Sequence, residues 1–337
     1  MNKKILLVDD SPFMRKIMSD LISEIDGLSI SSTARNGRDA LKQLAGSQPD
    51  VVLMDVQMPG LNGLDTLAMI REAYQLPVMM MSADSSKDLT IEALERGAID
   101  FIEKPKDLRR YADDFKAVVA EKMRVLDRTT VTSQIKPLVS MKKESAETVD
   151  FQQTEAIVIG ASTGGPKALL TLIRNLPAKV TLPIFIVQHM PAGFTASFAE
   201  RLNKETSATV VEATDGMPIQ SGTIYIAPGD HHMEIHQNKI CLHEEAKIHG
   251  VRPAVDLLFQ SAATCYGAHL VGLILTGMGH DGTKGCSSIK QHGGFILAQD
   301  EETSVVYGMP GNAVKQGMVD QSASLTKLSE WINWIIG

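Results

Sequence analysis

Short apolar runs alternate with amphipathic stretches over residues 1–123. Between the runs, apolar residues recur at helical spacing, as in PFMRKIMSDLISEI and LDTLAMIREAY. The runs themselves have the length of β-strands: KILLV (4–8), LSISSTA (28–34), VVLM (51–54), PVMMM (77–81) and DFIE (100–103). Because strands that alternate with helices build parallel sheets, residues 1–123 are predicted to form a five-stranded parallel sheet with helices on both faces.

This pattern stops at residues 124–153, which are polar, contain a proline and show no sustained period. We interpret this stretch as a linker. From residue 154 the alternation resumes, with strand candidates AIVIG (156–160), PIFIVQ (183–188), ATVVEA (208–213), TIYIAPG (223–229), LVGLILTG (270–277) and GFILAQD (294–300). Residues 154–337 are therefore predicted to form a second, doubly wound and mostly parallel α/β domain.

Composition narrows the classes of function. The chain has 337 residues, 44% of them hydrophobic, which suffices for two cores. A net charge of −7 disfavours a nucleic-acid partner. The three cysteines lie too far apart for a zinc motif or a disulfide framework: Cys241, Cys265 and Cys286. With neither a secretory segment nor an apolar run of membrane-spanning length, the sequence predicts a cytoplasmic protein that does not insert into membranes.

Polar side chains end the predicted strands of the first domain. Asp9 and Asp10 follow the first strand, Asp55 the third, Ser82 the fourth and Lys104 the fifth. Carboxyl ends of parallel strands meet at one sheet edge, so these groups are expected to converge. Three close carboxylates repel one another, and a hard cation such as Mg²⁺ relieves that repulsion. Asp55 is then placed to attack a phosphoryl group, with the metal and Lys104 neutralising charge.

The segments LLVDDSPFMR, VVLMDVQMPGLNG, MMMSAD and DFIEKP resemble the signatures of response-regulator receiver domains. The resemblance implies a flavodoxin-like fold and Asp55 as phospho-acceptor. It implies Mg²⁺ held by Asp9, Asp10, Asp55 and the backbone carbonyl of Gln57. It also implies Ser82 and Phe101 as switch residues and Lys104 as a phosphate contact.

The second domain opens with the stretch GASTGG, in which Ser162 follows a predicted strand and precedes a helical pattern. This fits the G-x-S-x-G turn that exposes a serine nucleophile at a sheet edge. A dinucleotide loop would need glycine at position 162, and a Walker A loop would need Gly-Lys-Ser/Thr. A structural glycine-rich turn remains the alternative.

A nucleophilic serine needs a base and an orienting acid. His189 ends the strand predicted next in the chain, and Asp281 follows the strongly apolar LVGLIL in the loop TGMGHDG. Competing histidines are His231, His232 and His280, and weaker acid candidates are Asp215 and Asp300. The order Ser…His…Asp differs from that of α/β-hydrolases.

The motifs GASTGGP, VQHMPAGFT, IAPGDHHM, RPAVDLLF and LTGMGHDG are similar to those of chemotaxis protein-glutamate methylesterases, as is Gly308-Met309-Pro310. The resemblance implies Ser162 as nucleophile, His189 as base, Asp281 as orienter and the Met278 amide as oxyanion donor. It implies a monomer that needs no cofactor for ester hydrolysis. The partners implied are the cytoplasmic helices of methyl-accepting chemoreceptors, as substrate, and a chemotaxis histidine kinase, as phosphodonor. Two alternatives are a receiver with a nucleic-acid-binding output and a binding module that has lost catalysis.

Overall fold

The structure is a computed structural model that describes residues 2–83, 86–104, 111–126 and 151–337. The chain forms two compact units that divide between residues 130 and 131, within the predicted linker. Each unit is described by itself.

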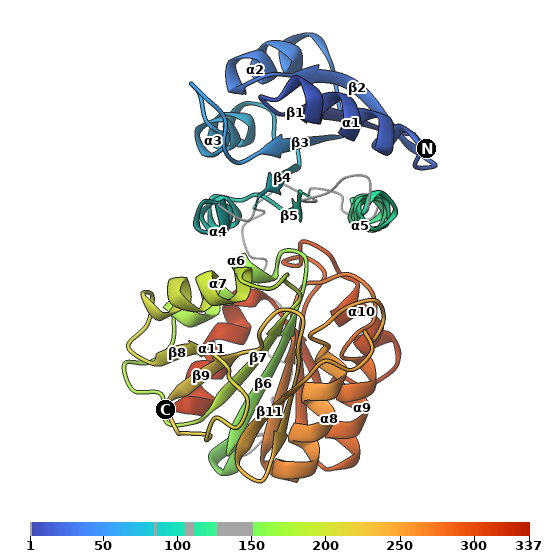
Figure 1. The fold of residues 1–337 in the computed structure, drawn as a ribbon. Coiled ribbons are helices and arrows are strands. Elements are labelled where there is room, and N and C mark those ends of the chain that lie inside the picture. Colours follow the sequence, from blue (N-terminus) through green and yellow to red (C-terminus); the bar gives the residue numbers. More distant parts are fainter. Residues whose placement is uncertain (1, 84–85, 105–110, 127–150) are drawn as a thin grey trace. The chain divides into compact units, whose positions relative to one another are not determined.

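The first unit is a five-stranded parallel sheet in the order β2-β1-β3-β4-β5. Helices α1 and α5 cover one face, and α2, α3 and α4 cover the other (Figure 1). The strands are β1 (Lys3–Val8), β2 (Leu28–Ala34), β3 (Val51–Asp55), β4 (Val78–Ser82) and β5 (Asp100–Glu103). The helices are α1 (Pro12–Ser23), α2 (Gly37–Gly46), α3 (Gly63–Ala73), α4 (Lys87–Glu95) and α5 (Ala112–Val125).

The apolar character of the central strands explains why helices cover both faces of this sheet. Strands β3 and β4 are buried along their whole length, so their apolar runs do not alternate with polar residues. Strands β1 and β3 pair directly, while the chain leaves them toward opposite edges of the sheet. Such a topological switch point creates a crevice at the carboxyl ends of the strands, where β1 is followed by Asp9 and β3 ends in Asp55.

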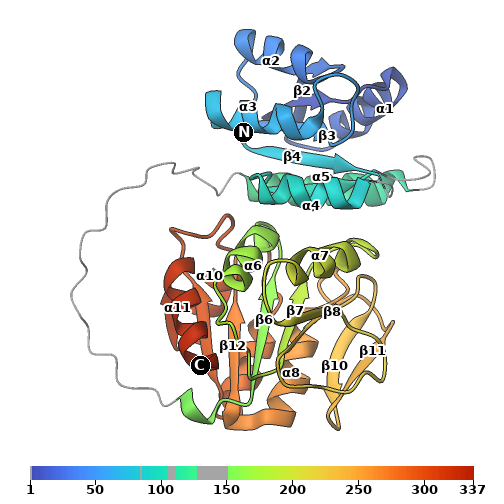
Figure 2. The ribbon, with the colours of Figure 1, turned by 90° about the vertical axis from the view of Figure 1, so that its left-hand side faces the viewer.

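The second unit contains a seven-stranded, entirely parallel sheet in the order β14-β13-β12-β6-β7-β9-β8. Helices α6, α7 and α11 lie on one face and α8, α9 and α10 on the other (Figures 1 and 2). The strands are β6 (Ala156–Ala161), β7 (Ile184–Gln188), β8 (Thr209–Glu212), β9 (Thr223–Ile226), β12 (Leu270–Ile274), β13 (Phe295–Gln299) and β14 (Gln321–Ala323). The helices are α6 (Gly165–Arg174), α7 (Phe194–Asn203), α8 (Val255–Tyr266), α9 (Thr283–Gln291), α10 (Met309–Lys315) and α11 (Leu325–Ile336).

An antiparallel hairpin stands apart from this sheet. It consists of β10 (His232–His236) and β11 (Lys239–His243), and β10 packs against α8. All eleven predicted strands are present in the two sheets, with bounds that differ by a few residues. The hairpin and β14 were not predicted.

The predicted linker is entered from both sides by regular structure. Helix α5 extends to Val125, and a 3₁₀ turn covers Phe151–Gln153; the residues between 127 and 150 lie outside the described part. The ring of Phe151 packs edge-on against Phe295 and Trp334, with centroids 5.1 and 5.4 Å apart. Because Phe295 begins β13, the chain enters the second unit at the amino ends of its strands.

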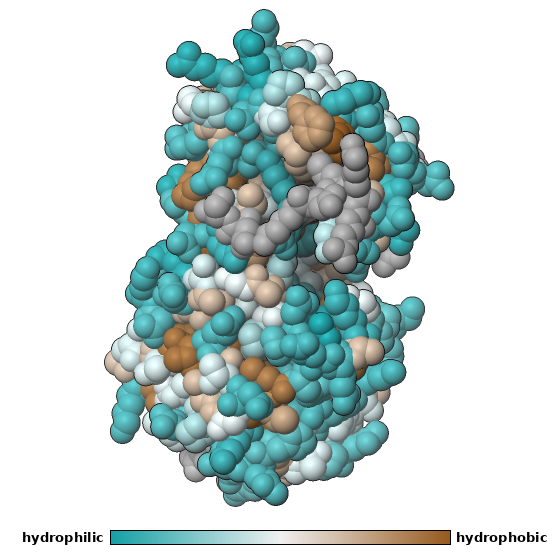
Figure 3. Space-filling view, in the orientation of Figure 1, coloured by the Kyte–Doolittle hydropathy of each residue, from teal (hydrophilic) through white to brown (hydrophobic). Residues whose placement is uncertain are grey.

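The face seen in Figure 3 is largely hydrophilic, with small separate apolar spots. Among the described residues, the large hydrophobic side chains that are exposed are Phe13, Met69, Tyr74, Tyr111, Val118, Val314 and Trp334. None of the described helices combines the length and apolar character needed to cross a membrane.

Candidate active site

Ser162 occupies the turn between β6 and α6 and is half-buried. The turn is tight because Gly164 adopts a left-handed conformation at φ 78°. Gly165 lies so close to Gln188 that a Cβ atom on Gly165 would fall 2.0 Å from Gln188 Oε1. The side-chain amide of Gln188 donates through Nε2 to the Ser162 carbonyl at 3.0 Å, and this hydrogen bond fixes the backbone at Ser162. The sequence therefore folds here as the strand–turn–helix that the G-x-S-x-G pattern predicts.

His189 lies beside Ser162 on the neighbouring strand. Ala161 pairs with Gln188, and the His189 amide donates to the Ala161 carbonyl at 3.1 Å, so the ladder continues one residue past the strand ends. Ser162 and His189 are thus adjacent at a strand spacing of about 4.8 Å. On the other side of β6, the Ser162 amide donates to the Thr276 carbonyl at 3.1 Å. The serine therefore sits between β7 and β12, at the switch point of the second sheet.

Asp281 is a buried acceptor for four donors. Its Oδ2 faces His189 Nε2 at 2.8 Å and the Val255 amide at 2.7 Å. Its Oδ1 accepts from the amides of Asp256 and Gly282 at 3.0 and 2.9 Å. Val255 and Asp256 begin α8, whose own cap residue makes no side-chain bond, so Asp281 caps this helix from a distant loop.

The environment of Asp281 favours its ionised form. Burial works to raise the pKa of Asp281, but the hydrogen bond and charge of His189, together with the Val255 and Asp256 amides, outweigh burial and lower this pKa. An ionised carboxylate then orients the imidazole. Because Nε2 of His189 faces the carboxylate, Nε2 carries the proton, and Nδ1 is the nitrogen left to accept one. The two ring nitrogens thus exchange the roles they have in trypsin-like triads.

Two groups beside the pair have no partner in the described part of the chain: the Ser162 hydroxyl and the Met278 amide make no hydrogen bond there. The Gly277 carbonyl accepts from the amides of Gly308 and Met309 at 3.1 and 2.8 Å. In a trans peptide the next N–H points opposite to this carbonyl, so the start of α10 fixes the direction of the Met278 N–H. An aimed, unpaired amide is what stabilisation of an oxyanion requires.

Sequence reasoning recorded the Gly308-Met309-Pro310 motif but did not foresee this positioning role. It also assigned no role to Asn312, which follows the motif; the Asn312 side-chain amide donates to the Gly279 carbonyl at 2.8 Å and holds the same loop. No spacing in the sequence links residue 312 to residue 279.

The competing histidines and acids have other partners. His232 is fully buried, accepts from the Ala254 amide through Nδ1 and faces the Ala246 carbonyl with Nε2. Burial, the first cause, lowers the pKa of His232 and keeps it neutral. The other candidates contact residues outside the Ser162 turn: His231 contacts Glu244, His280 contacts His249, Asp215 accepts from the Leu242 amide and Asp300 accepts from Thr303. Of all these candidates, only His189 and Asp281 pair beside Ser162.

The first unit brings its predicted acids and lysine together. Lys104 Nζ lies 2.6 Å from Asp9 Oδ2 and also bonds Asp55 Oδ2. Carboxylate oxygens of Asp9, Asp10 and Asp55 all lie within 4.8 Å of one another. Burial raises the pKa of Asp55, and the charge of Asp9 adds to this effect, while Lys104 and the Gln57 amide oppose it. Burial alone would lower the pKa of Lys104, but Asp55 and Asp9 reverse the direction and raise it.

This oxygen-rich donor set fits a hard divalent cation. Lys104 bonds two of the three acids, Asp9 and Asp55, so the cluster has more carboxylates than ammonium groups. The Gln57 carbonyl accepts no hydrogen bond from the described residues. The residues present therefore fit the Mg²⁺ site that the receiver resemblance implies.

Ser82, the predicted switch residue, uses its hydroxyl in hydrogen bonds at the start of α4. Its Oγ bonds Thr90 Oγ1 at 2.5 Å and Ser86 Oγ at 3.1 Å, both on or beside the first turn of α4. Phe101, the predicted aromatic switch, is buried, and Lys122 Nζ lies 5.8 Å from its ring centre. The structure thus links the Ser82 side chain to α4.

The comparisons with known proteins agree with this arrangement. Residues 5–116 match the response regulator receiver domain, so the chain is a response regulator with an α/β output domain. Residues 157–332 match the CheB methylesterase model, and the chain belongs to the CheB methylesterase family. Both family resemblances, and the α/β fold with its five-stranded receiver sheet, are therefore confirmed.

Similar proteins extend over the full chain. A protein-glutamate methylesterase/protein-glutamine glutaminase of Pyrococcus horikoshii is 42% identical, over 98% of this chain and 92% of its own length. One of Clostridium acetobutylicum is 40% identical over 99% and 97%. The crystal structure of the Thermotoga maritima CheB methylesterase catalytic domain is 43% identical, covers 54% of this chain and 99% of its own, and has a TM-score of 0.52.

Proposed function

We propose that this protein is a phosphorylation-activated serine hydrolase that demethylates glutamate γ-methyl esters, and deamidates glutamines, on the cytoplasmic helices of chemoreceptors. The observation that carries the proposal is the 2.8 Å contact between His189 Nε2 and Asp281, beside a serine at the switch point. The names of the relatives supply the substrate class.

In the proposed mechanism, Nδ1 of His189 takes the proton of Ser162 while the serine oxygen attacks the ester carbonyl. Asp281 stabilises the imidazolium that forms. The Met278 amide donates to the oxyanion, a contact worth about 3–4 kcal/mol of barrier in other serine hydrolases. His189 then gives this proton to the leaving methoxide, which departs as methanol, and water releases glutamate from the acyl-enzyme by the same steps. The reaction needs no cofactor in this scheme.

Regulation is proposed to start at Asp55 of the first unit. A chemotaxis histidine kinase is the expected phosphodonor, and Asp9, Asp10, Asp55 and the Gln57 carbonyl would hold Mg²⁺, which would neutralise charge on the phosphoryl group. Phosphorylation adds about −1.5 to −2 charge. Lys104 would contact the phosphoryl oxygens, and Ser82 would have to leave Thr90 to do so. We further propose that the unphosphorylated receiver blocks the site, and that the protein acts as a cytoplasmic monomer with domains 1–123 and 154–337.

The test is methanol release from methylated receptor membranes, with and without a phosphodonor. Ser162→Ala should reduce release to the uncatalysed background while Asp55 still accepts phosphate. Retained release would refute the assignment of the nucleophile. Labelling of the wild type by a fluorophosphonate separates an active hydrolase from a binding module that has lost catalysis, and a gel shift tests the nucleic-acid alternative.

A further inference from the structure

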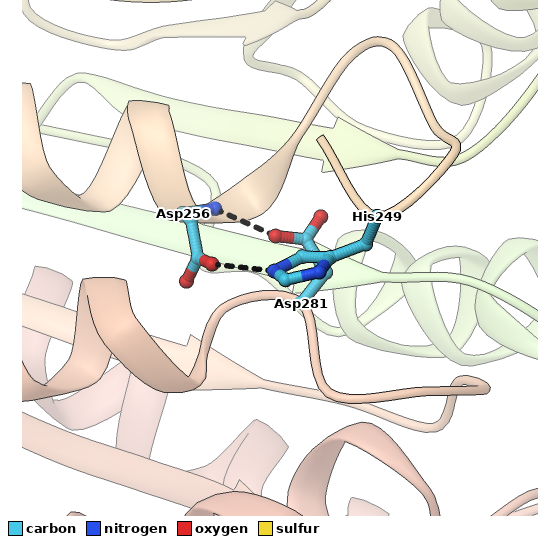
Figure 4. A group of neighbouring side chains, drawn as sticks. All are labelled: His249, Asp256 and Asp281. Atoms are coloured by element: carbon cyan, nitrogen blue, oxygen red, sulfur yellow. Dashed lines mark hydrogen bonds and ion pairs between the residues drawn. The ribbon is translucent and has the colours of Figure 1, made fainter. Parts of the chain in front are cut away.

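A second imidazole–carboxylate pair lies directly behind Asp281. His249 Nε2 is 3.3 Å from Asp256 Oδ2, and one ligand atom from each of His249, Asp256 and Asp281 lies within 4.8 Å of the other two (Figure 4). Both carboxylates are almost completely buried, at 2% exposure each. Two buried like charges at this distance repel each other strongly unless a cation or a proton balances them.

The two carboxylates belong to one hydrogen-bonded unit. The Asp256 amide donates to Asp281 Oδ1 at 3.0 Å (Figure 4), and Asp256 Oδ1 accepts from the Gly285 amide at 2.8 Å. Burial raises the pKa of Asp256 and the charge of Asp281 adds to this, while the Gly285 amide and His249 oppose it. His249 therefore supplies the side-chain contact that favours an ionised Asp256.

The backbone of His249 is held in an uncommon conformation. His249 and Gly250 have φ angles of 53° and 82°, and Ile248 and Val251 exchange backbone hydrogen bonds around them. Positive φ at both central positions is the pattern of a type I′ turn, for which Asn-Gly is the preferred pair. Histidine is a less favoured residue here than asparagine, so turn formation alone does not account for it. Its ring also packs against His280, with centroids 4.2 Å apart.

We propose that His249 is a positioning residue for the hydrolase: paired with Asp256, it balances charge behind Asp281 and keeps that carboxylate aligned on His189. The proposal rests on the proposed function, because it assigns a role relative to the His189–Asp281 pair. Other titratable groups also face this unit. The His280 ring packs edge-on against His249, while His232 interacts electrostatically with Asp281 and Cys286 with Asp256.

The His249–Asp256 pair predicts that the two single substitutions, His249→Asn and Asp256→Asn, shift the pH–rate profile in opposite directions. Removing the imidazole leaves an unbalanced negative charge near His189, which favours its imidazolium. Removing the carboxylate takes away a negative charge near His189, which disfavours its imidazolium. The acid limb of the pH–rate profile should therefore move to higher pH in His249→Asn and to lower pH in Asp256→Asn. Asp281 lies between the two groups, 2.8 Å from His189 Nε2 and within 4.8 Å of Asp256, so the charges of His189 and Asp256 are roughly 7 Å apart. At an effective dielectric between 20 and 80, the expected shift is about 0.4 to 1.7 pH units.

The experiment measures the rate of fluorophosphonate labelling of the full chain between pH 5 and 9, which reads out Ser162 activation without receptors. His249→Asn installs the preferred Asn-Gly turn and so is expected to fold. The double variant should return the limb close to that of the wild type, because the balanced charges are removed together. His236→Asn is the matched control, since it deletes an exposed imidazole–carboxylate pair with Glu234 and should leave the limb unchanged.

Limbs that stay in place in both single variants, or that move in the same direction, would overturn the inference while leaving the hydrolase intact. Failure of the proposed function looks different, because the wild type would then resist labelling or Ser162→Ala would still be labelled. Thermal melts identify a misfolded variant, in which case His249→Gln replaces His249→Asn in the same comparison.

Discussion

Replacing Asp281 by asparagine changes one atom and has consequences that can be worked out from the four donors around the carboxylate. An amide has one oxygen, and that oxygen can keep the Asp256 and Gly282 amides at the Oδ1 position. The new NH₂ group then faces His189 and the Val255 amide. To accept from this NH₂ group, His189 Nε2 must lose its proton, so the proton moves to Nδ1 and the base toward Ser162 is lost.

The expected decreases in kcat and in stability follow from the changed His189 tautomer and from the Val255 amide left without an acceptor. The wrong tautomer in a serine protease triad lowers kcat by about 10,000-fold, and we expect about 1,000- to 10,000-fold here. The stranded Val255 amide costs about 1–3 kcal/mol of unfolding free energy. For a domain of this size, that lowers the thermal midpoint by about 2–12 °C.

The pH dependence of stability has a defined sign. Since the folded-state pKa of Asp281 is lowered, its contribution is fully present above the unfolded-state value of about 3.9. The contribution is lost as pH falls through the lower folded-state pKa. The stability difference between wild type and Asp281→Asn should therefore shrink on acidification below about pH 4.

The assays are methanol release under saturating phosphodonor and thermal melts from pH 3 to 8. Asp300→Asn is the matched control, because the Asp300 side chain accepts hydrogen bonds from Thr303 in its own turn and its replacement should leave kcat unchanged. A kcat for Asp281→Asn within tenfold of wild type would refute the tautomer argument. An unchanged thermal midpoint would refute the capping role.

Three further predictions concern control of the site. A fragment of residues 151–337 should release methanol faster than the unphosphorylated full chain. A folded fragment of equal or lower activity would exclude simple occlusion of the site by the receiver. Under occlusion, a shift of the closed-to-open ratio from 99:1 to 1:99 on phosphorylation needs about 5.5 kcal/mol. Asp55→Asn should abolish stimulation by phosphodonor. Because burial raises the pKa of Asp55, the same substitution should also raise the thermal midpoint at pH 7, and this gain should fade toward about pH 4. A lower midpoint at pH 7 would contradict the expected gain. Thr90→Val removes one of the two hydroxyl partners, Thr90 and Ser86, that hold Ser82 toward α4, so the phosphodonor concentration for half activation should fall about two- to tenfold. A rise would show that the contact with Thr90 assists activation.

The fold was largely readable because burial leaves a periodic pattern. Strands such as β3 and β6 are buried along their whole length and appear as unbroken apolar runs. The hairpin of β10 and β11 escaped prediction because its sequence, HMEIHQNKICLH, is rich in histidine and charge. Strand β14 is only three residues long, and its parallel pairing with β13 is a contact that no local pattern reports.

The candidate site was predictable where a residue ends a strand, as Ser162 and His189 do. It was not predictable where a contact joins distant loops. The capping of α8 by Asp281 and the hold of α10 on Gly277 depend on tertiary packing alone. The role of His249 also lay outside sequence reasoning, because a histidine in a left-handed turn gives no signal without the backbone angles.

The aromatic packing of Phe151 on Phe295 and Trp334 fixes where the chain enters the second unit, at the end of the sheet opposite Ser162. Residues 127–150 can span at most about 86 Å. A linker of this reach keeps the receiver at an effective concentration of about a millimolar around the second unit. A receiver supplied as a separate molecule at micromolar levels would be too dilute to substitute for the attached one, so cross-regulation between copies is disfavoured by covalent linkage alone.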